Sequence, residues 1–163
     1  MHHNIKNLVV GFIFLNILYS KTDIKILSNT EQNLLIELDF SVNTAADLFP
    51  KSIFVGLPNK LLPETKIILS EESEMSFQND IPVSNVIEWA NIQKLKNLNT
   101  ATLKVSPKIS TSSYLKKIRI NIFFKKNQNS YRSANKNESK ILSKKIINWD
   151  QAKYWILKEK TAT

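Results

Sequence analysis

The segment from Tyr114 to Phe124, with the sequence YLKKIRINIFF, carries the clearest structural pattern in the chain. Its apolar residues fall at every second position, and polar residues fill the positions between them. Side chains of a β-strand point alternately to its two faces, so this spacing predicts a strand with one buried and one wet face. The apolar set is Ile118, Ile120, Ile122 and Phe124, and the polar set is Lys117, Arg119 and Asn121.

The same two-residue period recurs along most of the chain and predicts an all-β fold. A pair of such segments flanks the polar turn at residues 28–33 and predicts a hairpin. Segments 81–89 and 90–98 are less regular, and a strand followed by a helical turn fits them. Counting every segment gives an antiparallel β-sandwich of about seven short strands, closed by a short C-terminal helical turn. The other periodic segments are 24–26, 34–42, 53–57, 66–69 and 101–105.

Residues 1–20 have the composition of a signal peptide. Lys6 supplies a positive start, and an apolar run from Leu8 to Ser20 follows it. Such a run is too short to cross a bilayer as a helix, so no membrane span is expected. We therefore predict secretion across an inner membrane to the periplasm, the outer membrane or the exterior, with cleavage after Ser20. The alternative is a cytoplasmic protein whose first strand is buried.

Composition excludes several kinds of active site. The chain has no cysteine, and its two histidines, His2 and His3, both lie in the predicted leader. Cysteine or histidine catalysis and zinc binding are therefore not expected, nor is a cofactor. The acidic loop at Glu71, Glu72 and Glu74 lacks the ligand spacing of a calcium site. A carboxylate pair drawn from Asp39, Asp47, Glu88 and Asp150 is formally available, but no spacing selects two of them, so the chain is not expected to be an enzyme.

A net charge of +9 raises the question of an anionic partner. The lysines are spread along the chain and no nucleic-acid-binding motif is present, so nucleic acid is not expected as a partner. Residues 125–140 are polar and basic without an apolar period, which predicts a loop or linker. Within it, one hypothesis is an anion site, for polysaccharide or nucleic acid, with Tyr131 available for stacking. Its cations are Lys125, Lys126, Arg132 and Lys136.

Residues 141–163 return to apolar character after the linker. Asn148 and Gln151 have the spacing of a helix-capping box, which predicts a short terminal helix. On that helix Trp149, Ala152 and Ile156 would share one face, packing on the sheet. The resulting division is a leader at 1–20, a β-sandwich domain at 21–124, a basic linker at 125–140 and a junction segment at 141–163.

The order of these segments resembles the N-terminal, propeptide-like region of gingipain-type cysteine peptidases, particularly the sortase of the type IX secretion system. The similarity rests on ILSNTEQNLLIELDF, SIFVGLP, YLKKIRINIFF and IINWDQAKYWILK. The last contains a junction motif of the form Asn-aromatic-x-x-Ala-x-x-Trp, here Asn148, Trp149, Ala152 and Trp155.

The resemblance implies a non-catalytic β domain that precedes a caspase-like catalytic domain and shields it or helps it fold. The chain departs from the family pattern because it ends at Thr163, before any catalytic domain. It therefore resembles an isolated leader domain that contacts a peptidase domain, in cis or in trans, or another envelope protein. The alternative is a stand-alone envelope or surface domain that binds anionic polysaccharide.

Overall fold

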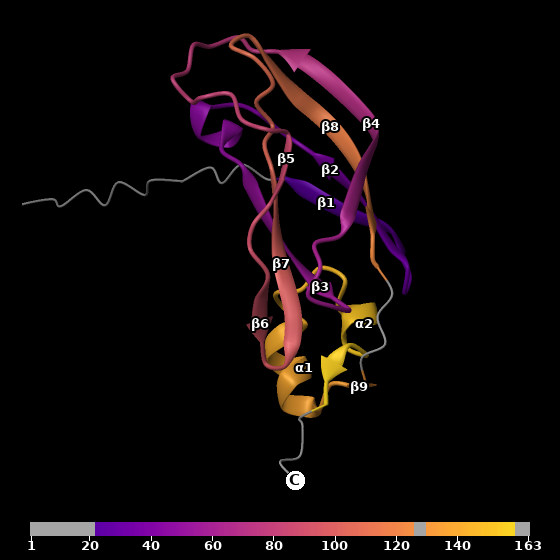
Figure 1. Cartoon of the computed structure of the whole chain (residues 1–163). Coiled ribbons are helices and arrows are strands. Elements are labelled where there is room, and N and C mark those ends of the chain that lie inside the picture. Colours follow the sequence, from indigo (N-terminus) through magenta and orange to yellow (C-terminus); the bar gives the residue numbers. More distant parts are fainter. Residues whose placement is uncertain (1–21, 126–129, 159–163) are drawn as a thin grey trace, which may run out of the picture.

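The computed structural model describes residues 22–125 and 130–158, whose two main antiparallel sheets pack face to face (Figure 1); a third sheet has only two short strands. The larger sheet, sheet A, has the strand order β1-β2-β8-β4. The smaller, sheet B, has the order β3-β7-β5, with β6 also paired to β7. The predicted all-β sandwich is confirmed. The strands of sheet A are β1 (Asp23–Asn29), β2 (Asn33–Asp39), β8 (Ser113–Phe123) and β4 (Glu64–Glu74); those of sheet B are β3 (Lys51–Leu57), β7 (Leu98–Val105), β5 (Ile87–Trp89) and β6 (Gln93–Leu95).

Strand β8 is the centre of sheet A and agrees with the alternation that predicts it. Ile118, Ile120 and Ile122 are fully buried, whereas the intervening Lys117 and Arg119 are only half-buried on the outer face. Both neighbours run antiparallel to β8 along most of its length. The isoleucines of this strand lie in one apolar cluster with residues of the second sheet, which explains why one face of β8 is buried.

The predicted N-terminal hairpin is present as β1 and β2. Its turn is closed by the backbone N–H of Thr30, which donates to the carbonyl of Asn33 at 2.8 Å. The register shifts between Ile26 and Ser28, which marks a β-bulge at Leu27. The hairpin is therefore regular only in the first half of β1.

The stretch at 90–98 forms a second tight hairpin rather than the helical turn that its sequence suggests. Leu95 of β6 lies opposite Leu98 of β7, and only Lys96 and Asn97 connect them. Both connecting residues have positive φ, 49° and 64°, which two-residue hairpins require and asparagine tolerates well. The strand predicted before it corresponds to β5.

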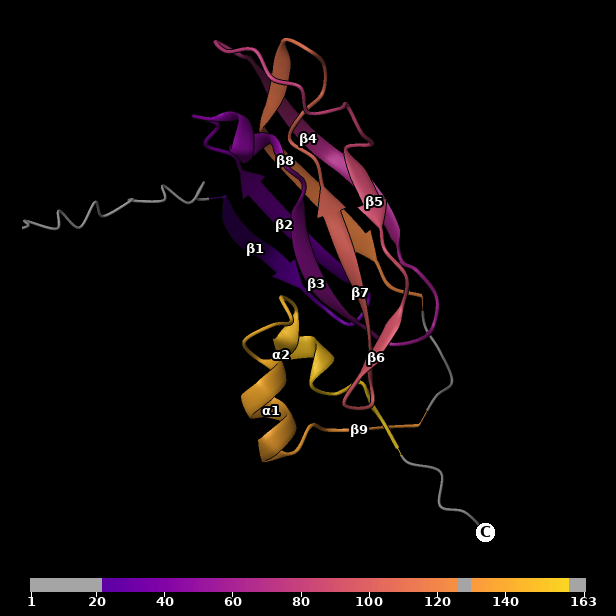
Figure 2. The same ribbon diagram turned by 90° about the vertical axis from the view of Figure 1, so that its left-hand side faces the viewer.

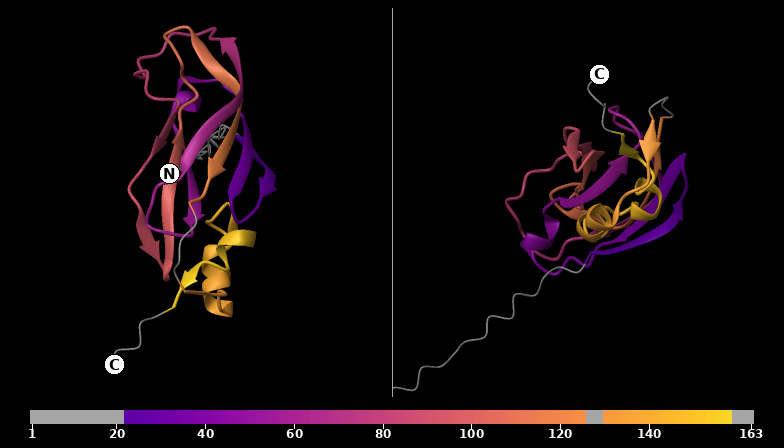
Figure 3. Two further views of the ribbon diagram at one scale, coloured as in Figure 1. Left: turned by 45° about the vertical axis from the view of Figure 1, so that its right-hand side comes forward. Right: turned by 90° about the horizontal axis from the view of Figure 1, so that it is seen from below.

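The C-terminal residues form a small lobe at one end of the sandwich, with its helices under the end of sheet B (Figure 2). The views in Figure 3 show this C-terminal lobe, residues 131–158, projecting along the long axis of the sandwich. It contains the predicted short helical turn. Its elements are β9 (Tyr131–Arg132), α1 (Lys136–Leu142), α2 (Trp149–Ala152) and β10 (Ile156–Leu157). Elsewhere in the described part of the chain there is one short helix, η1 (Ala45–Leu48).

Part of the segment predicted as a basic loop is regular structure. Strand β9 pairs with β10, and helix α1 begins at Lys136. The helix starts there because Asn135 and Glu138 form a reciprocal capping box, which satisfies free N–H groups of its first turn. The sequence shows no apolar period here because only two side chains of the helix are buried, Glu138 and Leu142.

One apolar core joins the two sheets and the C-terminal lobe. Leu34, Ile36 and Leu38 of β2 lie in it beside the isoleucines of β8. The lobe contributes Leu142, Ile146, Ala152, Trp155 and Ile156 to the same cluster. Its packing against the sandwich positions the residues of the junction motif.

Candidate functional site

Asn148, the first residue of the junction motif, occupies a fully buried position beside the open edge of β3. Its Oδ1 accepts a hydrogen bond from the backbone N–H of Gly56 at 2.8 Å, and its Nδ2 donates to the carbonyl of Gly56 at 3.0 Å. The neighbouring Ile147 N–H donates to the carbonyl of Phe54 at 2.9 Å. The segment thus supplies the backbone partners that a further strand would give to β3.

The predicted capping role of Asn148 is wrong. Asn148 does precede α2, but its side chain makes no capping hydrogen bond and no box with Gln151 forms. The side-chain amide bonds to Gly56 instead. A buried backbone group left without a hydrogen-bond partner costs more free energy than an exposed one at a helix end.

Ala152 is fully buried and lies against Gly56. A Cβ placed on Gly56 would lie 2.5 Å from the Cβ of Ala152 and 3.2 Å from Cγ2 of Ile146. The first distance is too short for a methyl group unless α2 or β3 moves, whereas the second requires only a small shift of the Ile146 side chain. Both small residues are thus required for the close approach of α2 to β3.

Trp155 connects the end of β8 to the lobe. Its ring meets Phe124 edge to face, with centroids 5.2 Å apart, and only 6% of the residue is exposed. Trp149 is half-buried against the core, whereas Ile156 belongs to β10 rather than to the helix face predicted for it. The junction motif is therefore a packing device that seals one end of the sandwich.

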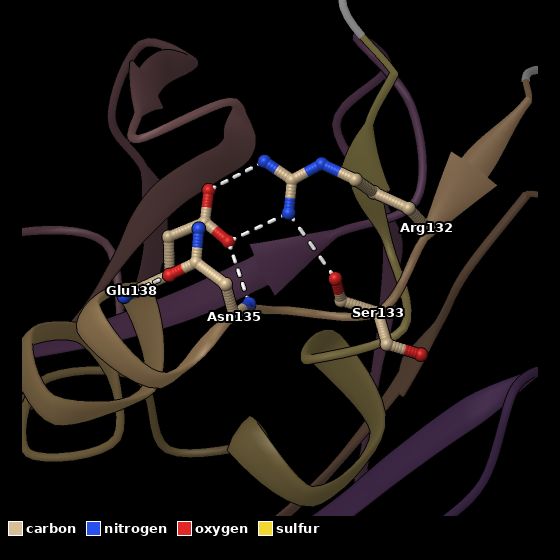
Figure 4. Close-up of polar contacts among 4 residues, drawn as sticks. All are labelled: Arg132, Ser133, Asn135 and Glu138. Atoms are coloured by element: carbon tan, nitrogen blue, oxygen red, sulfur yellow. Dashed lines mark hydrogen bonds and ion pairs between the residues drawn. The ribbon is translucent and has the colours of Figure 1, made fainter.

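Arg132 and Glu138 form the best-defined charged group of the lobe (Figure 4). The two carboxylate oxygens of Glu138 accept from Nη1 and Nη2 of Arg132, each at 2.7 Å. The carboxylate also accepts from the N–H of Asn135 at 2.8 Å. These hydrogen bonds from Arg132, and then that from Asn135, lower the pKa of Glu138 despite its burial.

Two cations of the predicted anion site have carboxylate partners in the structure. Arg132 is engaged by Glu138, and Lys125 forms an ion pair with Glu64 at 3.0 Å. Lys136 is exposed at the start of α1, and Lys126 lies outside the described residues. The hydroxyl of Tyr131 donates to the carbonyl of Pro58, which ties its ring to the sandwich.

On the outer face of sheet A, a second arginine–glutamate pair joins two strands, with both donors on one carboxylate oxygen. Glu37 of β2 accepts from Nε and Nη2 of Arg119 on β8, at 3.1 and 2.5 Å. This hydrogen bonding lowers the pKa of Glu37. Nearby, Lys117 lies 3.9 Å from Asp39. The wet face predicted for β8 is thus a set of cross-strand charge pairs.

The four carboxylates considered for catalysis lie on different elements. Asp47 accepts from the N–H groups of Asn43 and Thr44, both at 2.8 Å, and Asp150 lies 3.8 Å from Lys153. Asp39 has Lys117 as its neighbour, and Glu88 of β5 lies opposite Lys104 of β7. No two of them form a pair, and residues 22–125 and 130–158 contain no cluster of metal-ligating side chains.

The open edge of β4 carries a concentration of exposed apolar side chains. Ile67 is 42% exposed and Ile68 is 52% exposed. The loop that leads into the strand adds Leu61 and Leu62, which are also exposed. We call these four residues the β4 patch. Exposed apolar groups that gather at a strand edge are typical of protein contact surfaces.

Two of these features had signals in the sequence. Asn135 and Glu138 have capping-box spacing, and the single glycine of the described residues, Gly56, marks a close approach of backbone. The β4 patch had no such signal, because alternation predicts which face of a strand is apolar but not whether a second sheet covers it.

No helix within the described ranges is long and apolar enough to cross a membrane. Neither a family model, nor a curated protein, nor a solved structure matches the chain.

Proposed function

We propose that this chain is a secreted, non-catalytic β-sandwich that acts by contact with a peptidase domain, as the prodomain of a gingipain-type peptidase does. Its action would be to shield that domain or to help it fold. The observation that carries the proposal is the β4 patch, at an edge of sheet A that has no further strand beside it among the described residues. The register of β4 shifts between Ile67 and Leu69, so the patch offers a partner apolar contacts rather than a regular backbone ladder.

The resemblance of the chain to the propeptide-like region supplies the identity of the partner. The sealed end of the sandwich, where the junction motif packs on Gly56, supports a compact binding module. The paired charges on sheet A and in the lobe support the same reading, because they tie neighbouring elements of this module together.

The experiment is a titration of the purified protein against a gingipain-type peptidase domain encoded in the same genome. Calorimetry gives the affinity, and cleavage of a peptide substrate reports shielding. We expect binding that Ile67→Lys together with Ile68→Lys weakens by about tenfold or more, since a charge at an apolar contact is costly. Phe54→Lys is the matched control, because Phe54 is an equally exposed apolar residue (45%) on the outer face of sheet B.

Two results would oppose the proposal. One is the absence of both binding and any effect on cleavage. The other is equal loss of binding in the β4 and Phe54 variants, which would point to general damage rather than a contact at β4.

Binding of anionic polysaccharide is the second candidate, and the exposed lysines of α1 favour it. Lys136 and Lys140 lie on this helix, and Lys144 and Lys145 follow it. It ranks below the first because Lys125 and Arg132 already have carboxylate partners. Retention on heparin that falls with salt and with Lys136→Gln and Lys140→Gln, together with no peptidase binding, would reverse this order.

A further inference from the structure

Strand β1 is the other open edge of sheet A, opposite β4 in the strand order. Among the described residues it pairs with β2 alone, and Figure 2 shows it at the outer margin of the sheet. Every residue from Asp23 to Leu27 is exposed. Ile24 and Ile26 lie opposite the buried Leu38 and Ile36, so they belong to the core face but extend past the cover of sheet B. They are 37% and 47% exposed.

The hydrogen-bond pattern of β2 indicates which backbone groups of β1 are free. The N–H of Phe40 donates to the carbonyl of Lys116, and the N–H of Phe124 donates to the carbonyl of Gln32, each at 2.8 Å. Even-numbered residues of β2 therefore bond toward β8, and odd-numbered residues bond toward β1. Asp39 and Glu37 lie opposite Asp23 and Lys25, so the backbone N–H and C=O groups of Asp23 and Lys25 point toward β2. The peptide groups of Ile24 and Ile26 then point to the open edge.

The bulge limits the length over which another strand can pair. It lies at Leu27, and a bulge twists an edge and interrupts its ladder. The regular part of the edge is therefore residues 22–26, and its centre is Ile24.

We propose that this edge pairs with the β1 strand of a second copy of the chain, antiparallel and with a two-fold axis at Ile24. In this register Asp23 of each copy lies opposite Lys25 of the other, so two pairs of opposite charges form. A shift that still lets the peptide groups of Ile24 and Ile26 bond across the edge would place Lys25 opposite Lys25 of the other copy. Repulsion between these like charges disfavours that register. The charges thus select one self-complementary register.

Pairing joins the two four-stranded sheets into one continuous sheet and covers Ile24 and Ile26 of both copies. Such an isologous contact closes on itself and leaves the β4 edge free. With only five residues per copy, the contact is smaller than a standard interface of about 800 Å² per partner, so the dimer is expected to be weak.

Charge exchange tests the register. The protein is expressed from the full sequence, its N-terminus is determined by mass spectrometry, and sedimentation velocity is measured over a range of concentrations. We expect a concentration-dependent dimer that Asp23→Lys or Lys25→Asp weakens by about tenfold or more, since each places like charges across the axis. Equal mixtures of the two variants should form a heterodimer, because Lys then faces Asp at every position.

The mixture shows whether a variant lost the dimer through charge repulsion or through misfolding, since two misfolded variants would not associate when mixed. Ile67→Lys is the control at the other edge and should leave the dimer unchanged. A monomer at millimolar concentration, no heterodimer on mixing, or a dimer that only Ile67→Lys disrupts would overturn the proposal. None of these outcomes depends on whether a peptidase domain binds.

Discussion

At the scale of single residues, the contact of Gly56 with Asn148 and Ala152 decides how the C-terminal lobe joins the sandwich. Gly56 has no positive φ, so its backbone conformation is open to any residue. What only glycine allows is the approach of α2, because the nearest side-chain atom would lie 2.5 Å from an added Cβ. Asn148 then replaces the missing neighbour strand with one amide group.

Gly56→Ala is expected to lower the free energy of unfolding by about 1–3 kcal/mol, the usual cost of overpacking. The reason is the clash with Cβ of Ala152. Urea unfolding of the two proteins measures the difference. In a double-mutant cycle, Gly56→Ala should cost less when Ala152 is first changed to glycine, since the clashing methyl group is then gone.

Two outcomes of the double-mutant cycle would contradict this prediction. If Gly56→Ala costs the same in both backgrounds, Ala152 does not limit the approach. If it costs nothing in either, the close packing of α2 on β3 is wrong.

At the scale of elements, β8 and a short helix after Asn148 were predictable, whereas α1 and the pairing of β9 with β10 were not. The acidic segment at Glu71, Glu72 and Glu74, expected to be a loop, belongs to β4. Strand β8 contains enough alternation to predict its type and both of its faces. Helix α1 has two buried side chains, and one of them is the charged Glu138, so no apolar period exists to reveal it. Its only local signal is the capping pair, which the basic composition around it obscures. The role of Asn148 depends on Gly56, 92 residues away, and no local pattern can report such a contact.

The cap of α1 makes part of the stability depend on pH. Arg132 and Asn135 lower the pKa of Glu138 below its unfolded value of about 4.3. A carboxyl with a lowered folded-state pKa stabilises the protein above the unfolded value, and that contribution is lost as pH falls through the folded-state pKa. Glu37 acts in the same direction through Arg119.

Glu138→Gln is therefore expected to destabilise the protein at pH 7 and to differ less from the parent at pH 3. Urea unfolding at the two pH values measures this difference. The matched background is Arg132→Met, in which Glu138→Gln should have a smaller effect at pH 7. A difference between parent and Glu138→Gln that stays constant with pH would show that the carboxylate charge is not what stabilises the cap.

At the scale of the whole molecule, the sandwich and the lobe share one core rather than sitting side by side. The lobe residues in this core are at most 6% exposed. They close the end of the sandwich between β3 and the end of β8, while β1 and β4 each have one neighbouring strand among the residues that the structure describes. The architecture thus separates an end that the lobe covers from the two edges of sheet A at which we propose partner contacts.

A chain that ends after Lys125 should consequently fail to fold. It loses four large buried side chains, and each contributes about 1.5–3 kcal/mol. The sum, about 6–12 kcal/mol, is comparable with the whole stability of an ordinary domain, about 5–15 kcal/mol. The side chains are Leu142, Ile146, Trp155 and Ile156.

The truncated chain also leaves the buried backbone of Gly56 without the partners that Asn148 provides, which adds an unsatisfied donor and acceptor at an apolar edge. Near-UV circular dichroism and amide dispersion in NMR spectra distinguish a folded from a collapsed chain. A control that ends after Lys158 keeps every described residue of the lobe and should give the spectra of the full protein. Cooperative unfolding of the shorter chain would instead establish the sandwich as an independent domain, and the lobe would then be a separable junction whose packing contributes little.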